Sequence, residues 1–473
     1  MESLLFLICM ALAVGLCAST AMAAIPAFPG AEGYGKWAQG GRGGRALFVT
    51  NLNDAGPGSF RAACEAEGPR MVIFRTGGTI TLKTPLTIAN PYLTIAGQTA
   101  PGGGICITTE HWRGDKSALS IRTDDAVLRY LRIRTAPPPP PGPGDDRYSY
   151  AWIDPISLWG KETCNIMLDH ISASWGSKDA IRSWAGPRDV TIQHCIMSEG
   201  ITPSLHSKGA LAAGGSDRFT FYRNLFAHNQ GRNPYIKGKD ENGTGTVATF
   251  QVTNNVIYDW EYYAMEVGVD DSLFWSPTPG DTRANLVGNY FKGGPSTDPR
   301  RHEVVVGKQG TVRLYLADNI GPHRPGGSGD EWEIVGLRWL SLDKEAPAGI
   351  PAPKMPYQAN EPFDLETLPR AVSAQTAYEE VLRDVGATKP MRDAVDKRVI
   401  TQVRNGTGRI IADPSEVGGW PALEAGQPYP DEDGDGMDDR WELAQFGSLD
   451  NDGRADSVGD GYTDLERFLE TLV

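Results

Sequence analysis

The stretch Phe219-Thr220-Phe221-Tyr222-Arg223-Asn224-Leu225 is one copy of a short phrase that recurs along the middle of the chain. Apolar residues alternate in each copy, and a polar residue, usually Asn, then turns the chain. Other copies occupy 190–196, 250–256, 284–290 and 312–320, with weaker ones at 127–133 and 166–171. The equivalent positions 195, 224, 255, 289 and 319 step by 29, 31, 34 and 30 residues. A period near thirty with short strands predicts a solenoid.

Each rung of such a solenoid cannot bury its apolar face alone, so rungs stack and share one continuous core. Stacking would align Asn224, Asn255, Asn289 and Asn319 into an internal ladder whose side-chain amides bond along the stack. The period-two alternation disfavours helical repeats. An all-β parallel β-helix is therefore predicted. A β-propeller is the second interpretation, although it requires about four strands per repeat.

The same region carries charged side chains at similar places on successive rungs. Between Asn165 and Gly238 these are Asp169-His170, Ser174-Trp175-Gly176, Asp179, His206-Ser207-Lys208-Gly209 and Gly231-Arg232-Asn233-Pro234. A row of cations beside carboxylates that can bind a metal suits a site for an acidic polymer. This combination favours an enzyme over a passive scaffold.

The bulk properties limit the kinds of partner. With 473 residues, the chain exceeds the usual single compact core, which predicts a long repeat domain or two domains. Its formal net charge of −14 argues against nucleic acid as a partner. An acidic polymer must then be bound by a local basic groove or a bridging cation, and not by the overall field.

The N-terminus has the pattern of a secretory signal peptide. An apolar run begins at Leu4, and a small-x-small site ends at Ala23, so 1–23 is predicted to be removed. No later run is long and apolar enough to span a bilayer. We therefore expect a secreted, extracellular protein that has no membrane partner and is a monomer.

The remaining chain divides into three predicted parts. A β-helix domain covers 24–330, an extension that packs on it covers 331–425, and an Asp-rich module covers 426–473. Within the extension, residues 374–385 have helical spacing with Gly386 as a stop, and 393–403 are a second predicted helix.

The Asp-rich module contains an EF-hand-like calcium loop. Asp431, Asp433 and Asp435 alternate, Gly436 permits the bend, and Glu442 stands at the twelfth position. We expect these carboxylates to bind Ca²⁺ in a structural role. A less regular copy follows, with Asp456, Asp460-Gly461, Asp464 and Glu466.

Four cysteines remain after the predicted signal peptide, namely Cys64, Cys106, Cys164 and Cys195. Export permits disulfides, and four cysteines allow three connectivities. Buried thiols that fill a core are the equally weighted alternative.

Several ordered phrases resemble the pectate lyases of polysaccharide lyase family 1. They are Ala27-Phe28-Pro29-Gly30-Ala31-Glu32-Gly33, Val49-Thr50-Asn51-Leu52-Asn53-Asp54, Thr94-Ile95-Ala96-Gly97-Gln98-Thr99-Ala100-Pro101-Gly102, Leu168-Asp169-His170, Ser198-Glu199-Gly200, His206-Ser207-Lys208-Gly209, His228-Asn229 and Arg232-Asn233-Pro234. The resemblance covers roughly residues 25 to 420. It implies a right-handed parallel β-helix, which agrees with the repeat pattern. It also implies β-elimination on α-1,4-linked polygalacturonate, giving 4,5-unsaturated oligogalacturonides.

The resemblance also implies roles for individual residues. Arg232 matches the family's catalytic arginine, the proposed base, and Lys208 matches the lysine that contacts the substrate carboxylate or the leaving oxygen. Lys237 falls where the family has a second arginine, and it is expected, like Lys208, to take part in catalysis and in substrate binding. His206 is expected to bind substrate beside Lys208. Asp154 and Asp179 are the matches to Ca²⁺ ligands in the cleft, because a cation there neutralises the uronate carboxylate. Asp169 and His170 are expected to stabilise a rung, with His170 at the inward ladder position.

One departure concerns the cleft metal. Better-studied members have an acid four residues before the second of these aspartates, where this chain has Trp175. The calcium site is then incomplete, rebuilt from Asp145 or Asp146, or formed only with substrate.

Three alternatives remain beside a pectate lyase. A polygalacturonase would need Gly-His-Gly and Arg-Ile-Lys phrases, and neither occurs in the chain. A non-catalytic polysaccharide-binding β-helix is permitted, because fold does not determine function. A lyase that acts on methylated pectin or another uronan would use the same C5 chemistry.

Overall fold

The computed structural model describes residues 25–142, 152–201, 206–238, 247–268, 281–307, 311–338 and 349–473. The predicted signal peptide, 1–23, lies outside these residues, and so do Asp145 and Asp146. Within the described ranges, no helix combines the length and apolarity needed to cross a membrane.

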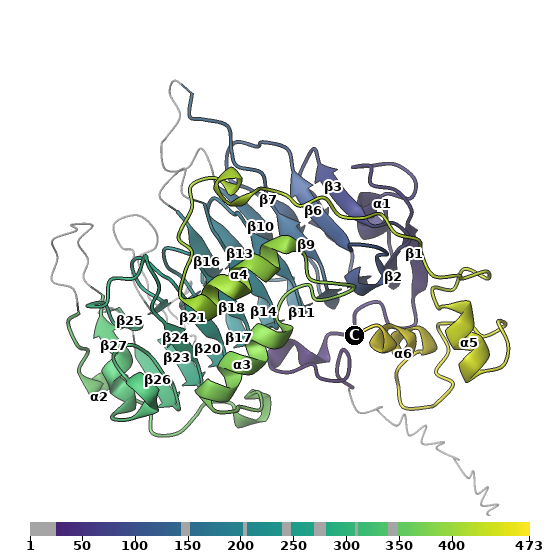
Figure 1. Cartoon of the computed structure of the whole chain (residues 1–473). Coiled ribbons are helices and arrows are strands. Elements are labelled where there is room, and N and C mark those ends of the chain that lie inside the picture. Colours follow the sequence, from purple (N-terminus) through teal and green to yellow (C-terminus); the bar gives the residue numbers. More distant parts are fainter. Residues whose placement is uncertain are drawn as a thin grey trace, which may run out of the picture.

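The chain winds through three parallel sheets in turn, which we name sheets A, B and C (Figure 1). Sheet A contains β1 (Arg45–Val49), β2 (Arg70–Phe74), β5 (Leu93–Ala96), β8 (Ala126–Arg129), β11 (Cys164–Asp169), β14 (Arg188–Gln193), β17 (Asp217–Tyr222), β20 (Val247–Thr253), β23 (Asp281–Val287) and β26 (Val312–Ala317). Sheet B contains β3 (Gly78–Leu82), β6 (Ile105–Thr109), β9 (Arg132–Arg134), β12 (Ser172–Ser174), β15 (Ile196–Ser198), β18 (Leu225–Ala227), β21 (Val256–Tyr258) and β24 (Tyr290–Lys292). Sheet C contains β4 (Leu86–Ile88), β7 (Lys116–Ile121), β10 (Ile153–Trp159), β13 (Asp179–Trp184), β16 (Lys208–Ala212), β19 (Tyr235–Ile236), β22 (Met265–Val267), β25 (Val304–Val306) and β27 (Val335–Leu337).

Each strand pairs with its counterpart on the next rung, so the order within every sheet follows the sequence. This is the arrangement predicted for a parallel β-helix; its right-handed winding stays a prediction. The alternating apolar residues of the repeated phrase, such as Ile192, Phe221 and Leu286, point inward and form one buried core. The period-two pattern therefore places one face of each strand inside the coil.

The predicted asparagine ladder is present at the corner between sheets A and B. The side-chain amide of Asn224 donates to Asn255 Oδ1 at 2.9 Å, and Asn255 and Asn289 each donate to the next asparagine at 3.0 Å. Cys195 occupies the preceding place, and its backbone N–H donates to Asn224 Oδ1 at 2.8 Å. The ladder satisfies buried polar groups that the turn would otherwise leave unpaired.

The cysteines are free thiols in the described chain, which decides between the two alternatives left open by the sequence. Cys64, Cys106 and Cys195 are buried, and Cys164 is half-buried. Cys64 and Cys195 belong to the apolar core, and none of the four forms a cross-link.

The extension adds two amphipathic helices in the predicted places. α3 (Ala374–Asp384) is capped by the Ser373 side chain, and α4 (Ala394–Asn405) by that of Asp393. Their apolar residues, including Val381 and Val399, pack on sheet B. The shorter helices are α1 (Phe60–Glu65), α2 (Lys354–Tyr357), α5 (Asp439–Gln445), α6 (Asp464–Thr471), and the 3-10 turns η1 (Tyr34–Trp37), η2 (Gly97–Thr99), η3 (Pro325–Gly327), η4 (Glu331–Ile334), η5 (Leu365–Thr367) and η6 (Pro414–Val417).

Buried ion pairs fasten α4 to sheet B. Arg134 has no exposed surface, and its Nη2 lies 2.9 Å from Asp393 and 2.8 Å from Asp396. The Ser172 hydroxyl donates to the other oxygen of Asp396 at 2.6 Å. Further along the chain, Leu465 and Phe468 of the C-terminal module pack on sheet A. The C-terminal segments thus cover sheets A and B.

We predict that Asn255→Ala lowers the free energy of unfolding by about 1–3 kcal/mol, because it leaves buried ladder partners unpaired. Chemical denaturation followed by circular dichroism measures the change. Asn360→Ala, at an exposed asparagine, is the control. Equal midpoints for the two variants would contradict a stabilising ladder.

Candidate active site

Sheet C brings most of the predicted site residues to one edge, by which we mean the side of the sheet where its strands begin. Asp154 is the second residue of β10, Asp179 begins β13, and Lys208 begins β16. The register sets Asp179 opposite Lys208, and Lys208 forms a bridge with Gly231. Because Arg232 follows Gly231 directly, two acids and two cations lie on consecutive rungs, one strand spacing apart.

The two acids are buried and in contact. The backbone N–H of Asp179 donates to Asp154 Oδ1 at 3.0 Å. Arg182 Nε lies 2.7 Å from Asp154 Oδ2, and Arg232 Nη1 donates to Asp179 Oδ1 at 3.1 Å. Burial raises the pKa of Asp154 to about 7. Each carboxylate therefore has one guanidinium partner.

The two cations face aromatic rings. The Arg232 guanidinium lies 5.5 Å from the ring centre of Tyr235, and the Lys208 ammonium lies 5.0 Å from that of Tyr262. Burial and the positive charge of Arg232 lower the pKa of Lys208 to about 8. Of these two positive charges, that of Lys208 is the more easily lost near neutral pH.

Four further residues complete this edge and were not singled out in the sequence. Arg182 pairs with Asp115 at 2.8 Å as well as with Asp154. The Lys178 ammonium lies 3.8 Å from the ring centre of Trp152. Their closeness to Asp179 in the sequence was the available signal, since Lys178 directly precedes it and Arg182 lies three residues after it in the same strand.

His206 and Lys237 lie at different distances from this group. The His206 ring packs edge-on against Trp152, with ring centres 5.7 Å apart, so it belongs to the same edge. Lys237 follows β19, and its backbone N–H donates to the oxygen of Ala212 at the far end of β16. Ala212 is four positions further along β16 than Lys208, which corresponds to roughly 13 Å. Lys237 therefore lies at the opposite edge of sheet C.

Trp175 does not face the two aspartates as a metal ligand would. It is fully buried, and its indole N–H donates to Glu199 Oε2 at 3.0 Å. Its ring packs against Trp420 of the extension, with ring centres 4.7 Å apart. Trp175 therefore holds the extension against the β-helix. In the part of the chain that the structure describes, no third acid joins Asp154 and Asp179 in a metal-sized cluster.

The predicted calcium loop has its acids together. Ligand atoms of Asp431, Asp433 and Asp435 lie within 4.8 Å of one another. Glu442 is fully buried, and neither of its carboxylate oxygens has a hydrogen-bond partner among the described residues. Burial and neighbouring negative charges raise the pKa of Glu442 to about 8 and that of Asp435 to about 6. Among these acids, Asp431 pairs with Arg75 at 2.9 Å, and negative charge crowds around Glu442 and Asp435.

The less regular second copy differs because an arginine lies in it. Arg467 pairs with Asp456 and Asp464 at 3.0 Å each, and also with Asp460. A guanidinium therefore lies among the acids of the second copy, whereas Glu442 of the first loop has no hydrogen-bond partner among the described residues.

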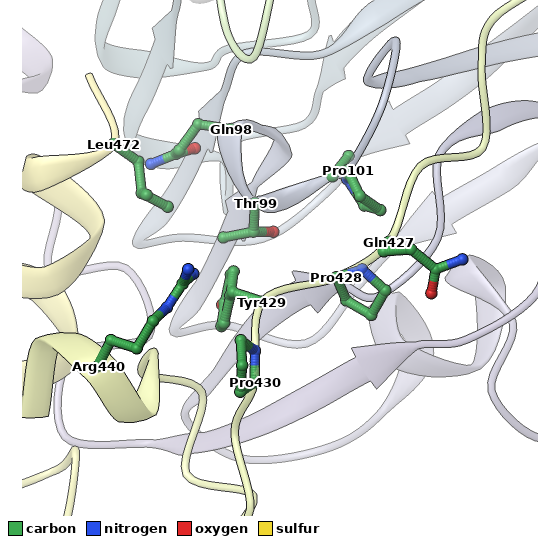
Figure 2. A pocket seen from close by; sticks show the side chains of 10 residues that line it. Gln98, Thr99, Pro101, Gln427, Pro428, Tyr429, Pro430, Arg440 and Leu472 are labelled. Carbon is green, nitrogen blue, oxygen red and sulfur yellow. The ribbon is translucent and has the colours of Figure 1, made fainter.

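A pocket of about 410 Å³ lies elsewhere, between the β-helix and the segment that leads into the module (Figure 2). Its walls include Gln98, Tyr429 and Arg440, and none of the predicted site residues lines it. It is therefore separate from the edge of sheet C.

Comparison with known proteins identifies the family of this chain. The described strands form a parallel β-helix, a fold that by itself does not determine function. The chain is 35% identical over 471 residues to a probable pectate lyase C of Aspergillus terreus, covering 97% of this chain and 96% of the relative. It is 33% identical to a probable pectate lyase C of Aspergillus fumigatus, covering 96% of each. The chain belongs to the pectate lyase family.

Other comparisons are more distant. A probable pectate lyase 5 of Arabidopsis thaliana is 27% identical over half of this chain. Among solved structures, the cedar pollen allergen jun a 1 matches with a TM-score of 0.47 at 16% identity, over 75% of this chain and 92% of its own. A pectate lyase from Bacillus sp. N165 in complex with trigalacturonate matches with a TM-score of 0.45 at 13% identity, over 75% and 98%. No family model matches the chain.

We predict that Lys208, with chelator present, titrates near pH 8 and that Arg232→Ala raises its pKa by removing a positive charge. Amine-directed labelling at increasing pH, followed by mass spectrometry, reports the neutral fraction. Exposed Lys83 supplies the reference rate. A midpoint near the ordinary lysine value of about 10.4 would refute the prediction.

Proposed function

We propose that this protein is a secreted pectate lyase that cleaves α-1,4-linked polygalacturonate in the extracellular space by β-elimination. The products would be 4,5-unsaturated oligogalacturonides. The observation that supports this most is the cluster of Asp154, Asp179, Lys208 and Arg232 on adjacent rungs of a chain that resembles pectate lyases along nearly its whole length.

The reaction removes the proton at C5 of a uronate and expels the glycosidic oxygen from C4. The C5 proton is acidic only when the adjacent carboxylate is neutralised, and cationic side chains in a buried site do this well. In the proposal, Lys208 binds that carboxylate or the leaving oxygen, and Arg232 takes the proton. His206 and Lys237 bind further parts of the polymer, with Lys237 at the other end of the strand.

The pairing of Arg232 with Asp179 bears on its role as a base. A guanidinium is protonated in water at ordinary pH, and a carboxylate partner favours that protonated state. Arg232 must therefore leave Asp179 and lose its own proton to water before it can accept the C5 proton. Any cation bound by Asp179 would compete with Arg232 for the same oxygens.

The two aspartates suit calcium in their chemistry, because Ca²⁺ prefers carboxylate oxygens. Asp154 and Asp179 would hold the ion, which when bound neutralises uronate carboxylates. Two carboxylates are fewer than a complete shell of six to eight oxygens. We therefore propose that substrate carboxylates supply part of the shell, the alternative in which the site forms only with substrate.

We predict that Arg232→Ala lowers kcat on polygalacturonate by about 100- to 10,000-fold, the range of a lost general base. The absorbance of the unsaturated product is followed with calcium and with chelator. Arg300→Ala, at an exposed arginine, is the matched control. If Lys208→Ala abolishes turnover while Arg232→Ala keeps it, the base is Lys208 and not Arg232.

The same assay separates the remaining alternatives. Product from methylated pectin or another uronan, and none from polygalacturonate, would move the proposal to that substrate. Binding of polygalacturonate without product, unchanged in Arg232→Ala, would indicate a non-catalytic polysaccharide-binding protein.

We also propose that Asp431, Asp433, Asp435 and Glu442 bind a structural calcium ion. The buried, unpartnered carboxylate of Glu442 supports this most, because an isolated buried charge is costly unless a cation compensates it. Asp431 also pairs with Arg75 of the β-helix at 2.9 Å, so the loop lies where the module meets the coil. Calcium would thus stabilise the docked module.

We predict that calcium raises the melting temperature of the chelated protein and that Glu442→Gln removes much of this gain, because it deletes a charged ligand. Differential scanning calorimetry with and without calcium measures the shift. Glu432→Gln changes an exposed acid of the same loop and is the control. To separate the cleft ion, the comparison is repeated in an Asp179→Asn background. Equal gains in both glutamate variants would exclude the loop as the site.

A further inference from the structure

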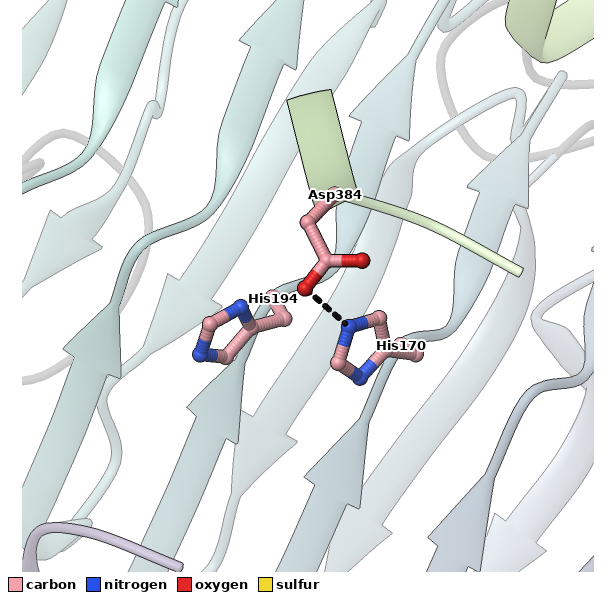
Figure 3. A group of neighbouring side chains, drawn as sticks. All are labelled: His170, His194 and Asp384. Atoms are coloured by element: carbon pink, nitrogen blue, oxygen red, sulfur yellow. Dashed lines mark ion pairs between the residues drawn. The ribbon is translucent and has the colours of Figure 1, made fainter. Parts of the chain in front are cut away.

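A second cluster of metal-binding side chains lies on the other side of the coil, at the corner between sheets A and B. Ligand atoms of His170, His194 and Asp384 lie within 4.8 Å of one another. Figure 3 shows Asp384, at the end of α3, reaching toward the two imidazole rings. None of the three belongs to the proposed active site or the calcium loop.

The strand register produces the histidine pair. Asp169 of β11 is paired with Gln193 of β14, so the next residues, His170 and His194, occupy the same place on adjacent rungs. Both have φ near +50°, in the left-handed region, and their rings stack with centres 4.8 Å apart. His170 therefore lies one residue before the ladder position, which corrects the expectation from the sequence. Its side chain faces outward to α3 and not into the core.

The contacts of His170 match those of a metal ligand better than those of a hydrogen-bonded side chain. Its Nε2 lies 3.6 Å from Asp384 Oδ2, too far for a hydrogen bond. Bonds of about 2.0–2.2 Å to a tetrahedral ion place two ligand atoms roughly 3.3–3.6 Å apart. His170 is 7% exposed, and its Nε2 has no hydrogen-bond partner among the described residues.

The other ring nitrogen of His170, Nδ1, faces a carboxylate, as the second nitrogen of a metal-bound histidine commonly does. This nitrogen lies 3.0 Å from Asp169 Oδ2. Asp169 is itself held by Arg129 at 3.0 Å and by the Gln193 amide at 2.9 Å. The His170 ring thus lies between the carboxylates of Asp169, at Nδ1, and Asp384, at Nε2.

We propose that His170, His194 and Asp384 bind a divalent transition-metal ion such as zinc, which clamps the end of α3 to the β-helix. Two imidazoles and one carboxylate favour such an ion over calcium, which prefers oxygen ligands. Asp384 is exposed, so water can fill the fourth position. The backbone N–H of Gly386 also donates to the oxygen of His194 at 2.8 Å, which holds the same segment in place. An ion pair between protonated His170 and Asp384 alone would leave His194 only its ring contacts with His170 and Tyr222.

The test uses the untagged mature protein, stripped with chelator and returned to excess calcium so that oxygen-ligand sites stay filled. Zinc is titrated in competition with a chromogenic chelator, and cobalt is added as a spectroscopic probe. We expect one zinc per chain and a cobalt absorption spectrum typical of a tetrahedral site. Asp384→Asn and His194→Gln should each weaken zinc binding by at least about 10- to 100-fold, the loss seen even for outer-shell partners.

Glu379→Gln, at an exposed acid on the same helix, should bind zinc like the unchanged protein. Asp384→Asn alters an exposed side chain, so its fold can be confirmed by circular dichroism even if His194→Gln does not fold. Absence of stoichiometric zinc binding would overturn the proposal, leaving an ion pair only. Undiminished binding in Asp384→Asn would overturn it as well. Neither result depends on lyase activity.

Discussion

In-register stacking of parallel strands is the constraint on which the rest of this structure depends. Each rung hydrogen-bonds to the next along its strands, so any residue type repeated at the rung period meets its counterpart at about one strand spacing, 4.7–4.9 Å. The asparagine ladder uses this spacing to satisfy buried amides. The stacked pair of His170 and His194 and the contact between Asp154 and Asp179 follow from the same rule. One repeat thus creates both the core and the clusters of side chains.

Charge is compensated locally in a chain whose overall balance is acidic. Asp154, Asp179 and Asp396 are fully buried, and each has an arginine partner. Removing one partner of such a pair is strongly destabilising, because it leaves a buried charge alone. The acidic loop that contains Glu442 is the exception, since Glu442 is buried and has no hydrogen-bond partner among the described residues. This loop, where compensation is missing, is one of the places where we propose a cation.

The C-terminal segments cover two of the three sheets, and the candidate active site lies on the third. α3 and α4 pack on sheet B, and the residues of α6 pack on sheet A, whereas the candidate catalytic side chains belong to sheet C (Figure 1). Trp175 connects the two roles. It stands where the family resemblance predicts a metal-binding acid, and it packs instead on Trp420 of the extension.

The sequence by itself determined the parallel β-helix, the asparagine ladder, the positions of α3 and α4 and the acidic loop. These depend on local periodicity, on caps and on spacing within one short segment, all of which are visible in the order of residues. Only the tertiary structure decided which side chains meet. Turns of unequal length separate the rungs, so the register comes from pairing between strands and cannot be counted along the chain. Arg232 pairs with Asp179, Lys237 lies at the far end of the strands of sheet C, and His170 points outward toward Asp384. Each of these positions depends on that register or on packing between distant segments.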